Sequence, residues 1–346
     1  MGPGETSQGL AVGRYLAQKG AEVSFIVLQK EVLRFVGDQF EAEYIADPEE
    51  VKNRIDKRNY DFVLLCNSKM FRESKSFQLE SPPNKPFVAS LDSNWLFDQP
   101  DKYPCIAWID QIFLNFPKQV YLNGLKENGG NFSIPSEIRN KIFNVGLIPS
   151  YDAPSQKSIE EVRKELEIAA DQKLIFAYIG SGTTSRSDFY DKCIAIFDGV
   201  CESDNKVKIL FVQYSGSEKK WLLPQSRDAL SGDRFYNYLA AADLVFQHQG
   251  LGTLEQAISA SVPVIANVNK PDPSETCNAH AWEVEPFQRA GLCKMHYYTD
   301  ENSAIINSIQ ELLFSGKAID KMSLSQSHQF NHGEEKLYEK IADTLK

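Results

Sequence analysis

Short apolar runs alternate with amphipathic stretches along most of this chain, and the alternation constrains the fold more than any other feature. The runs span residues 23–28, 62–66, 87–91, 174–179, 207–212, 244–247 and 262–267. Many of the segments between them have room for a helix of about 10–15 residues, the crossover that a parallel strand pair requires. The pattern therefore predicts an α/β protein with parallel sheets.

The chain is too long for one compact core, because single cores stop growing at about 250–300 residues and this sequence has 346. Residues 144–158 are rich in Gly, Pro, Ser and Asp, a composition that continues neither a helix nor a strand. We place the domain boundary there. The sequence thus predicts two doubly wound domains that face a cleft, over residues 1–148 and 149–325, followed by a C-terminal segment over residues 326–346.

Three segments carry helix signals. Asp47, followed by Pro48 and two glutamates, is typical of a helix start, with Asp47 as the cap and Pro48 at the first helical position. Ser158, with Glu161 three residues later, predicts a second start at the entrance to the second domain. The C-terminal segment predicts an amphipathic helix through the spacing of Leu337, Ile341 and Leu345.

The charge balance and the absence of long apolar runs exclude two classes of partner. Forty-seven acidic residues against 37 basic residues give a net charge of −10, the wrong sign for binding a polyanion backbone. No apolar run reaches the roughly 18 residues of a membrane span, and the N-terminus lacks the basic flank of a secretion signal. We therefore expect a cytoplasmic protein without a nucleic-acid partner or a transmembrane segment.

The cysteines lie far apart in the sequence, with no C-x-x-C pair and no histidine cluster beside them. Such scattering predicts buried, reduced thiols and neither a zinc site nor a disulfide framework. The six are Cys66, Cys105, Cys193, Cys201, Cys277 and Cys293.

The start of the sequence lacks an expected strand. In a doubly wound domain the first strand lies in the middle of the sheet and leads into a Gly-rich turn, yet here Met1 is followed directly by Gly2-Pro3-Gly4. A sheet without that strand leaves backbone groups buried and unpaired. We therefore expect either further sequence upstream of Met1 or another segment in that position.

The strongest local motif is an apolar run that enters a Gly-rich turn and then a helix, over residues 244–257. Glycines allow close backbone approach, and the first N–H groups of a helix are unsatisfied and lie at the positive end of its dipole. The motif therefore predicts a phosphate cradle, with Thr253 adding a hydroxyl. Two structural alternatives stay open: Gly250 and Gly252 can serve a tight turn alone, and His248 can be a satisfied histidine at a strand end.

Taken with residues 261–266, 275–279 and 290–292, this motif resembles the donor domain of GT-B glycosyltransferases of the inverting branch. That group includes UDP-dependent glucuronosyl and natural-product glycosyltransferases and the N-acetylglucosaminyltransferase of peptidoglycan precursors. The resemblance covers residues 235–313 well and residues 4–27 thinly. It implies two Rossmann-like domains facing an interdomain cleft, and a terminal helix that crosses back to the first domain.

The resemblance also implies the roles of several residues. Gln256 stands where the family has a ribose-binding Glu, and Thr276 stands where a Gln commonly follows the sugar-binding acid, so both positions depart from the pattern. Glu255 cannot replace Gln256, because adjacent helix positions lie about 100° apart. The implied donor-binding set is Gly4, Gly180, Ser181, Gly182, Thr183, His248, Gly250, Gly252, Thr253, Gln256, Glu275 and Thr276.

The N-terminal part of the resemblance points to a catalytic base. Counting back from Gly20 places Glu5 where the family has its histidine base. Inverting transfer needs a group that takes the acceptor's proton, and an apolar environment raises a carboxyl pKa enough for that task. The structural alternative is that Glu5 is a helix-start carboxylate favoured by the helix dipole.

Together these features predict inverting, metal-independent transfer of a sugar from a nucleotide donor, a UDP-sugar, to an acceptor hydroxyl. The sequence contains no Asp-x-Asp pair of the kind that binds a cation against a diphosphate, and no separate cofactor is expected. The acceptor is a small molecule or a lipid-linked compound. Two alternatives remain: a nucleotide-sugar 2-epimerase, and a catalytically silent scaffold or partner subunit of the same fold.

Overall fold

The chain divides into two compact units, which we describe separately. The computed structural model describes residues 3–37, 39–66, 85–92, 108–115, 136–148, 154–179, 186–212, 219–223, 232–248, 251–268, 279–315 and 332–345. The first unit comprises Met1–Ser150 with Phe330–Lys346, and the second comprises Tyr151–Gln329.

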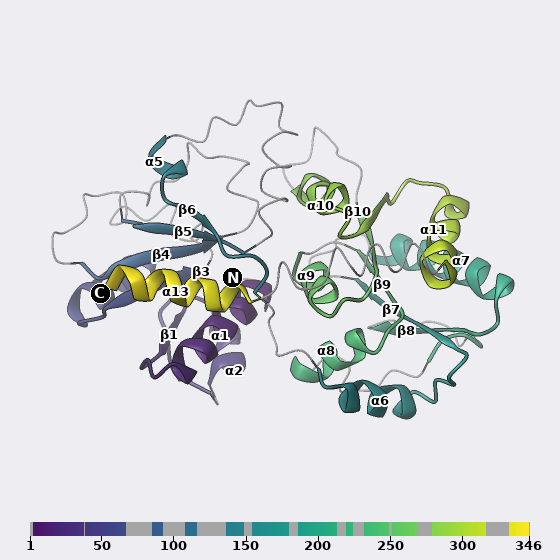
Figure 1. Ribbon diagram of the computed structural model, residues 1–346, viewed down its shortest axis with the longest axis horizontal. Coiled ribbons are helices and arrows are strands. Elements are labelled where there is room, and N and C mark those ends of the chain that lie inside the picture. The colour runs from purple at the N-terminus through teal and green to yellow at the C-terminus, as the bar shows by residue number, and fades with distance from the viewer. Residues whose placement is uncertain are drawn as a thin grey trace. The chain divides into compact units, whose positions relative to one another are not determined.

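The first unit contains two separate parallel sheets (Figure 1). One is the pair β1 (Ser24–Val27) and β2 (Glu41–Tyr44). The other has the order β3-β4-β5-β6, with bounds Phe62–Cys66, Phe87–Asp92, Gln111–Leu114 and Ile142–Asn144. The helical elements are α1 (Pro3–Gln18), η1 (Lys30–Val32), α2 (Leu33–Val36), α3 (Pro48–Lys57), α5 (Ser136–Arg139) and α13 (Gly333–Leu345).

The second unit is built on one five-stranded parallel sheet of order β11-β10-β9-β7-β8. In chain order its strands are β7 (Lys173–Ile179), β8 (Val207–Val212), β9 (Leu244–His248), β10 (Val264–Val268) and β11 (Lys294–Tyr297). Its helices are α6 (Gln156–Glu165), α7 (Arg186–Ser203), α8 (Gly232–Ala240), α9 (Leu251–Ser259), α10 (Ala279–Arg289) and α11 (Asn302–Phe314).

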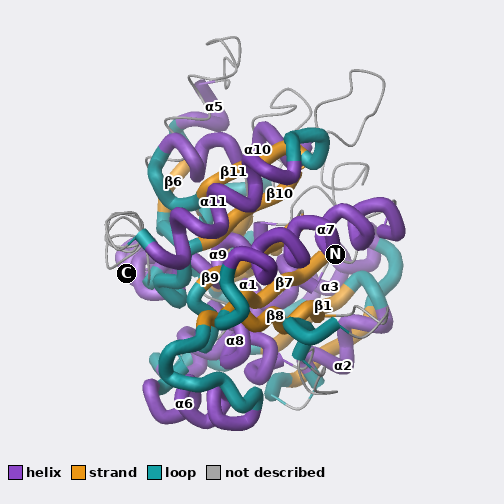
Figure 2. The backbone as a smooth tube through the Cα atoms, turned by 90° about the vertical axis from the view of Figure 1, so that its right-hand side faces the viewer, coloured by secondary structure: helices purple, strands orange, loops and turns teal. Residues whose placement is uncertain are grey.

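Helices cover both faces of this second sheet, with α7 and α11 on one side and α8 and α9 on the other (Figures 1 and 2). An apolar core lies between the sheet and the first pair of helices, where Phe197 contacts the rings of Phe211, Trp221 and Phe246. Both principal sheets are parallel and helix-covered, which confirms the α/β prediction made from the alternating apolar runs.

Of the two helix starts predicted from capping patterns, the one at Asp47 is confirmed and the one at Ser158 is not. Asp47 caps α3, its side chain accepting a hydrogen bond from the Glu49 N–H, with Pro48 at the first helical position. The prediction that Ser158 starts a helix is wrong. Helix α6 begins earlier because the hydroxyl of Ser155 accepts from the Ser158 N–H, which places Ser158 inside the first turn.

The cysteines of the described residues are free thiols, and two of the four are fully buried. Cys193 and Cys293 lie in the interior, whereas Cys66 and Cys201 are half-buried. Cys105 and Cys277 lie outside the described residues. Burial raises the pKa of the Cys201 thiol to about 12.

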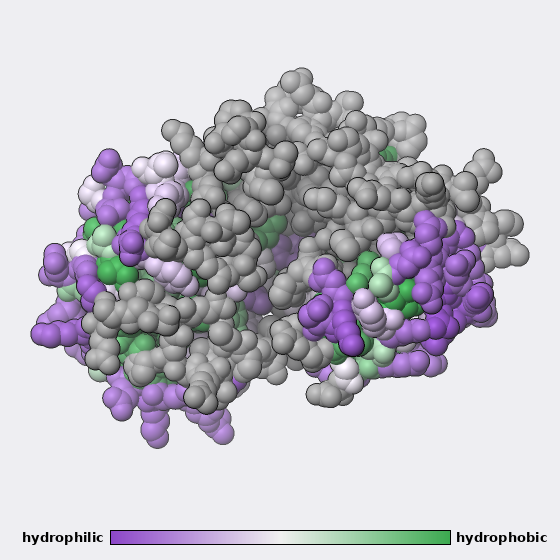
Figure 3. Space-filling view, turned by 180° about the vertical axis from the view of Figure 1, so that it is seen from behind, coloured by the Kyte–Doolittle hydropathy of each residue, from purple (hydrophilic) through white to green (hydrophobic). Residues whose placement is uncertain are grey.

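Polar side chains dominate the visible described surface, with hydrophobic side chains in smaller areas (Figure 3). No helix in the described part of the chain is both long and apolar enough to cross a bilayer.

The C-terminal helix α13 packs within the first unit, beside α1. Leu337 and Ile341 are buried in the core that α1 shares with the sheet β3–β6, while Leu345 at the helix end is 47 % exposed. The ring of Tyr338 meets that of Tyr15 edge to face. Gly333 begins the helix against residues 146–148, and its N–H donates to the Leu147 carbonyl at 2.9 Å.

We expect Gly333→Ala to destabilise the protein by about 1–3 kcal/mol, because the added methyl group overpacks this contact. A Cβ at that position would meet the Leu147 carbonyl oxygen at 2.7 Å and the Gly146 carbonyl oxygen at 2.9 Å, both backbone atoms. Chemical denaturation measures the change. Glu339→Ala, at an exposed position of the same helix, serves as the control and should stay within about 0.5 kcal/mol of the unmodified protein.

Candidate functional site

Polar side chains collect at the carboxyl edge of the second sheet, where all five parallel strands end. Strand β9 ends in Gln247 and His248, and β10 carries Asn267 next to its last residue. All three side chains are buried. In open α/β sheets, ligands bind outside the carboxyl ends of the strands, so this edge is where a site is expected.

His248 lies in register with residues of the two strands that flank β9. His248 pairs with Ile179 of β7 and with Asn267 of β10, and Asn267 pairs in turn with His296 of β11. Residues in register on parallel strands point to the same face. The imidazole of His248 packs on Phe189 of α7 with ring centroids 3.9 Å apart, so this contact helps to fix the position of the imidazole.

The adjacent histidine, His296, is held by two side chains. Its Nδ1 lies 3.2 Å from a carboxylate oxygen of Asp300, and its Nε2 lies 2.8 Å from the Ser308 hydroxyl. Burial lowers the pKa of His296, and the hydrogen bond with Asp300 only partly opposes that effect. Below a pH of about 6.5, the usual histidine pKa, this shift reduces stability because the unfolded chain takes up the proton more readily.

Helix α9 follows β9 and presents the predicted cradle residues in its first two turns. It begins at Leu251, so Gly252 and Thr253 belong to the first turn, whose N–H groups have no partner within the helix. Thr253 is buried and Gln256 is half-buried. Glu255 is also buried and faces a different direction from Gln256, as the 100° step of a helix requires.

The structure therefore describes His248, Gly252, Thr253 and Gln256 of the predicted donor-binding set, on β9 and α9. Gly4 and Glu5 lie in the first turn of α1, and the side chain of Glu5 is not described. The remaining predicted residues lie outside the described residues: Gly180, Ser181, Gly182, Thr183, Gly250, Glu275 and Thr276.

Two buried amides at this edge were not identified from the sequence. Gln247 and Asn267 are 0 % exposed, and neither the oxygen nor the nitrogen of either side chain has a hydrogen-bond partner among the described residues. Leaving such a group unsatisfied costs about 1–3 kcal/mol. The available signal was an amide near the carboxyl end of an otherwise apolar strand, in LVFQH and VIANV.

The first unit also has buried polar side chains at the carboxyl edge of its larger sheet. Asp92 ends β4 and is 2 % exposed; Ser90 precedes it by two residues, and Asn115 follows β5. The Ser90 hydroxyl and the side-chain amide oxygen of Asn115 have no hydrogen-bond partner among the described residues. The sequence signal, a Ser and an Asp closing an apolar run, was also missed. Each unit thus concentrates buried polar groups where parallel strands end.

In the described part of the chain, no group of three or more His, Cys, Asp or Glu side chains is arranged to hold a metal ion.

Comparison with known proteins identifies the fold. No protein-family model matches the sequence, and no curated protein matches it. A putative UDP-N-acetylglucosamine 2-epimerase from Listeria monocytogenes aligns with 100 % of this chain and 95 % of its own, with a TM-score of 0.65 and 13 % identity. The glycotransferase of kitacinnamycin aligns with 99 % and 96 %, with a TM-score of 0.63 and 12 % identity.

A third solved structure, S. aureus MnaA with UDP, aligns over 99 % of this chain and 94 % of its own, with a TM-score of 0.63 and 13 % identity. Similarity at this level of identity shows the fold. The chain therefore has the two-unit GT-B fold over its full length, shared by glycosyltransferases and UDP-N-acetylglucosamine 2-epimerases.

Replacing the unpartnered amides by apolar side chains should stabilise the protein. We expect Gln247→Leu and Asn267→Leu each to raise the free energy of unfolding by about 1 kcal/mol, because an unsatisfied buried amide is removed at similar volume. Chemical denaturation measures the effect. Asn53→Leu, at an exposed position of α3, is the control and should change little. A clear loss of stability in both variants would show that the amides are hydrogen-bonded in the folded protein.

Proposed function

We propose that the protein transfers a sugar from a UDP-sugar to an acceptor hydroxyl with inversion at the anomeric carbon. The observation that carries this proposal is the β9–α9 junction, where a buried histidine ends a strand and Gly252 and Thr253 open a nine-residue helix. The fold is that of enzymes that use nucleotide sugars, and one of the similar structures contains UDP, which supports the choice of donor.

The start of α9 suits the donor diphosphate on electrostatic grounds. The N–H groups of the first turn lack partners within the helix, and the helix dipole adds positive potential at that end. As the sugar leaves, negative charge grows on the diphosphate, and fixed N–H donors and the Thr253 hydroxyl stabilise that charge without reorganising. His248 contributes a further ring N–H at the end of the strand.

The remaining donor contacts in this proposal are those that the resemblance to GT-B glycosyltransferases implies. Gln256 hydrogen-bonds the ribose without the charge assistance that a Glu would give. Glu275 and Thr276 would accept and donate hydrogen bonds to the transferred sugar, and Gly180, Ser181, Gly182 and Thr183 would contact the phosphates. These contacts orient the anomeric carbon for attack.

The chemical step needs a base for the acceptor, and we assign that role to Glu5. Its carboxylate takes the proton of the acceptor hydroxyl while the acceptor oxygen attacks the anomeric carbon. The bond from that carbon to the diphosphate oxygen breaks, and the electron pair leaves with UDP. Attack opposite the leaving group inverts the configuration.

A 2-epimerase is the second candidate, and the buried Asp92 favours it. Epimerisation beside the anomeric carbon requires acid and base groups around the sugar ring, and Asp92 is a buried carboxylate at the carboxyl end of β4. Similar structures of both kinds cover the chain equally. A silent scaffold of this fold would bind nucleotide without turnover.

Nucleotide binding tests the donor site. We expect UDP to bind, and Thr253→Val to weaken binding by at least about tenfold, because a hydrogen bond to a charged group contributes about 1.5–3 kcal/mol. Calorimetric titration with UDP, TDP and GDP measures the three affinities and identifies which nucleobase the donor site prefers. Thr344→Val, at an exposed position of α13, is the matched control and should bind like the unmodified protein. Absence of binding by all three nucleotides would contradict the donor assignment.

Turnover tests the chemistry. We expect UDP release that depends on an acceptor, a product of inverted anomeric configuration by NMR, and a loss of at least about 100-fold in rate for Glu5→Gln with UDP affinity unchanged. Conversion of UDP-N-acetylglucosamine to its 2-epimer without an acceptor would instead establish the epimerase. Nucleotide binding with neither reaction would leave the scaffold role.

A further inference from the structure

His296 adds a second imidazole to the sheet edge that carries the candidate donor site. It lies in register with Asn267, and Asn267 lies in register with His248, so the two histidines are two strands apart. Neighbouring strands are about 4.8 Å apart, which places the two Cα atoms roughly 10 Å from each other. Both imidazoles lie on the face that α7 and α11 cover, since they contact Phe189 and Ser308, respectively.

The hydrogen bonds around His296 suit its protonated form. The Ser308 hydroxyl donates to the Ala304 carbonyl at 3.0 Å, so its oxygen is left to accept from the Nε2–H of the imidazole. On the other side of the ring, an Nδ1–H donates to the Asp300 carboxylate, which also accepts from the Tyr297 N–H. A neutral ring has only one N–H, so either one of these bonds is lost or the hydroxyl leaves Ala304.

The charged groups on the elements packed against His296 are Asp300, Lys294, Lys192 of α7, Glu311 of α11 and Glu285 of α10. Burial lowers the pKa of His296 most, the hydrogen bond with Asp300 opposes that effect, and the two lysines lower the pKa further. Both glutamates are engaged elsewhere, with Lys294 and with the Tyr297 hydroxyl. An added negative charge nearby therefore shifts the ring toward its protonated form.

The strand between the two histidines does not oppose such a coupling. Strand β10 has the sequence VIANV and carries no charged side chain. Its Asn267 is 0 % exposed, and neither polar atom of the amide has a hydrogen-bond partner among the described residues. A side-chain amide of this kind orients its dipole in the local field, so it follows the charges on either side.

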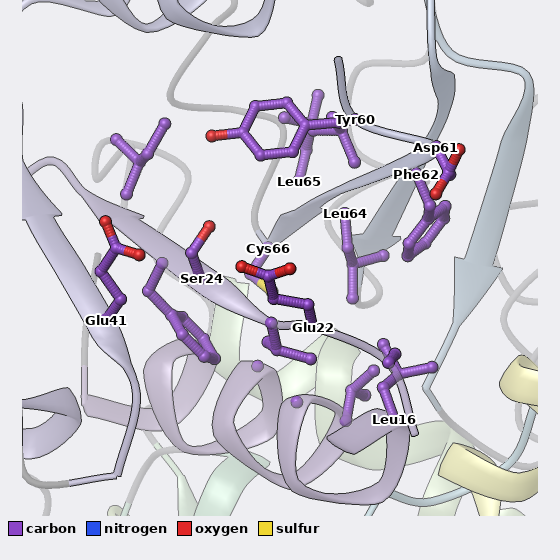
Figure 4. Close-up of a pocket in the computed structure, with 18 of the residues that line it drawn as sticks. Leu16, Glu22, Ser24, Glu41, Tyr60, Asp61, Phe62, Leu64, Leu65 and Cys66 are labelled. Atoms are coloured by element: carbon purple, nitrogen blue, oxygen red, sulfur yellow. The ribbon is translucent and has the colours of Figure 1, made fainter. Parts of the chain in front are cut away.

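A cavity of about 840 Å³ in the first unit is an alternative place for the nucleotide, since its volume is that of ordinary ligand pockets (Figure 4). The charged residues that line it are Glu22, Glu41, Asp61 and Arg58. The Arg58 guanidinium is 3.8 Å from the Glu41 carboxylate, so it is already paired. Three acids against one base disfavour a diphosphate there, and we therefore assign the anion to the second unit.

We propose that His296 is a proton-linked residue of the donor site, which takes up a proton as the diphosphate binds and thereby tightens its binding. This role rests on the nucleotide site proposed above, and it makes the charge of that site depend on pH. The imidazolium attracts the diphosphate across roughly 10 Å, and by reciprocity the diphosphate favours the imidazolium. The proton comes from solvent beside Asp300, whose side chain is 36 % exposed.

Calorimetric titration with UDP, in buffers of different ionisation enthalpy, counts the protons taken up on binding. At pH 6 we expect the unmodified protein to take up at least about 0.3 proton more per UDP than His296→Gln, whose side chain is neutral at every pH. The ratio of the two affinities should rise at least about twofold from pH 8 to pH 6, an attraction that solvent screens only in part. The titration of UDP itself is common to both proteins and cancels in these comparisons.

Two further variants shift the pH at which the UDP affinity changes, in opposite directions. Asp300→Asn removes the negative partner and lowers the pKa of His296, so the change moves to lower pH; Lys294→Gln removes a positive charge and moves it to higher pH. These shifts decide the matter if His296→Gln does not fold. His332→Gln, at an exposed position of the first unit, is the matched control and should take up protons like the unmodified protein.

The outcomes separate this role from the nucleotide site itself. Equal proton uptake by the unmodified protein and His296→Gln, with UDP bound by both, overturns the role of His296 and leaves the nucleotide site standing. Loss of affinity by the same factor at pH 6 and pH 8 also overturns it, because a purely structural contribution does not depend on pH in this way. Absence of UDP binding by the unmodified protein overturns the nucleotide site, and the role of His296 with it.

Discussion

Parallel strand pairing is the constraint on which the rest of this structure depends. A parallel pair cannot be closed by a short turn, so each strand is followed by a crossover that returns the chain to the same starting edge. As a result the carboxyl ends of all strands in a sheet gather on one side. His248 of β9 and Asn267 of β10 in one unit, and Asp92 of β4 and Asn115 after β5 in the other, lie at one sheet edge for this reason although they come from different strands.

The same constraint explains which parts of the fold could be predicted from the sequence. Strand β7 is largely buried on both faces, so residues 174–179 form a continuous apolar run that was predicted as a strand. The start of α6 was misplaced because Ser155 and Ser158 are chemically equivalent caps, and only the backbone geometry selects the first.

The candidate site was less predictable, because residue type and spacing do not report burial. His248, Gly252 and Thr253 were found since a strand, a Gly-rich turn and a helix follow one another in the sequence. Gln247 and Asn267 escaped notice because an amide inside an apolar run resembles a surface position until both neighbouring strands are placed. Their unsatisfied groups oppose stability, and natural proteins keep such groups where a bound partner or water supplies the missing hydrogen bonds.

The choice between transfer and epimerisation depends on how many acid and base groups act on the sugar. Transfer needs one base for the acceptor hydroxyl, since the diphosphate leaves with its charge stabilised by the helix start. Epimerisation breaks a carbon–hydrogen bond beside the anomeric centre and needs groups that remove and return a proton. Asp92 is a buried carboxylate at the carboxyl end of β4, the edge of a parallel sheet where ligands bind, so an acid or base role for it would favour epimerisation. The role of Asp92, more than the shared architecture, therefore separates the two reactions.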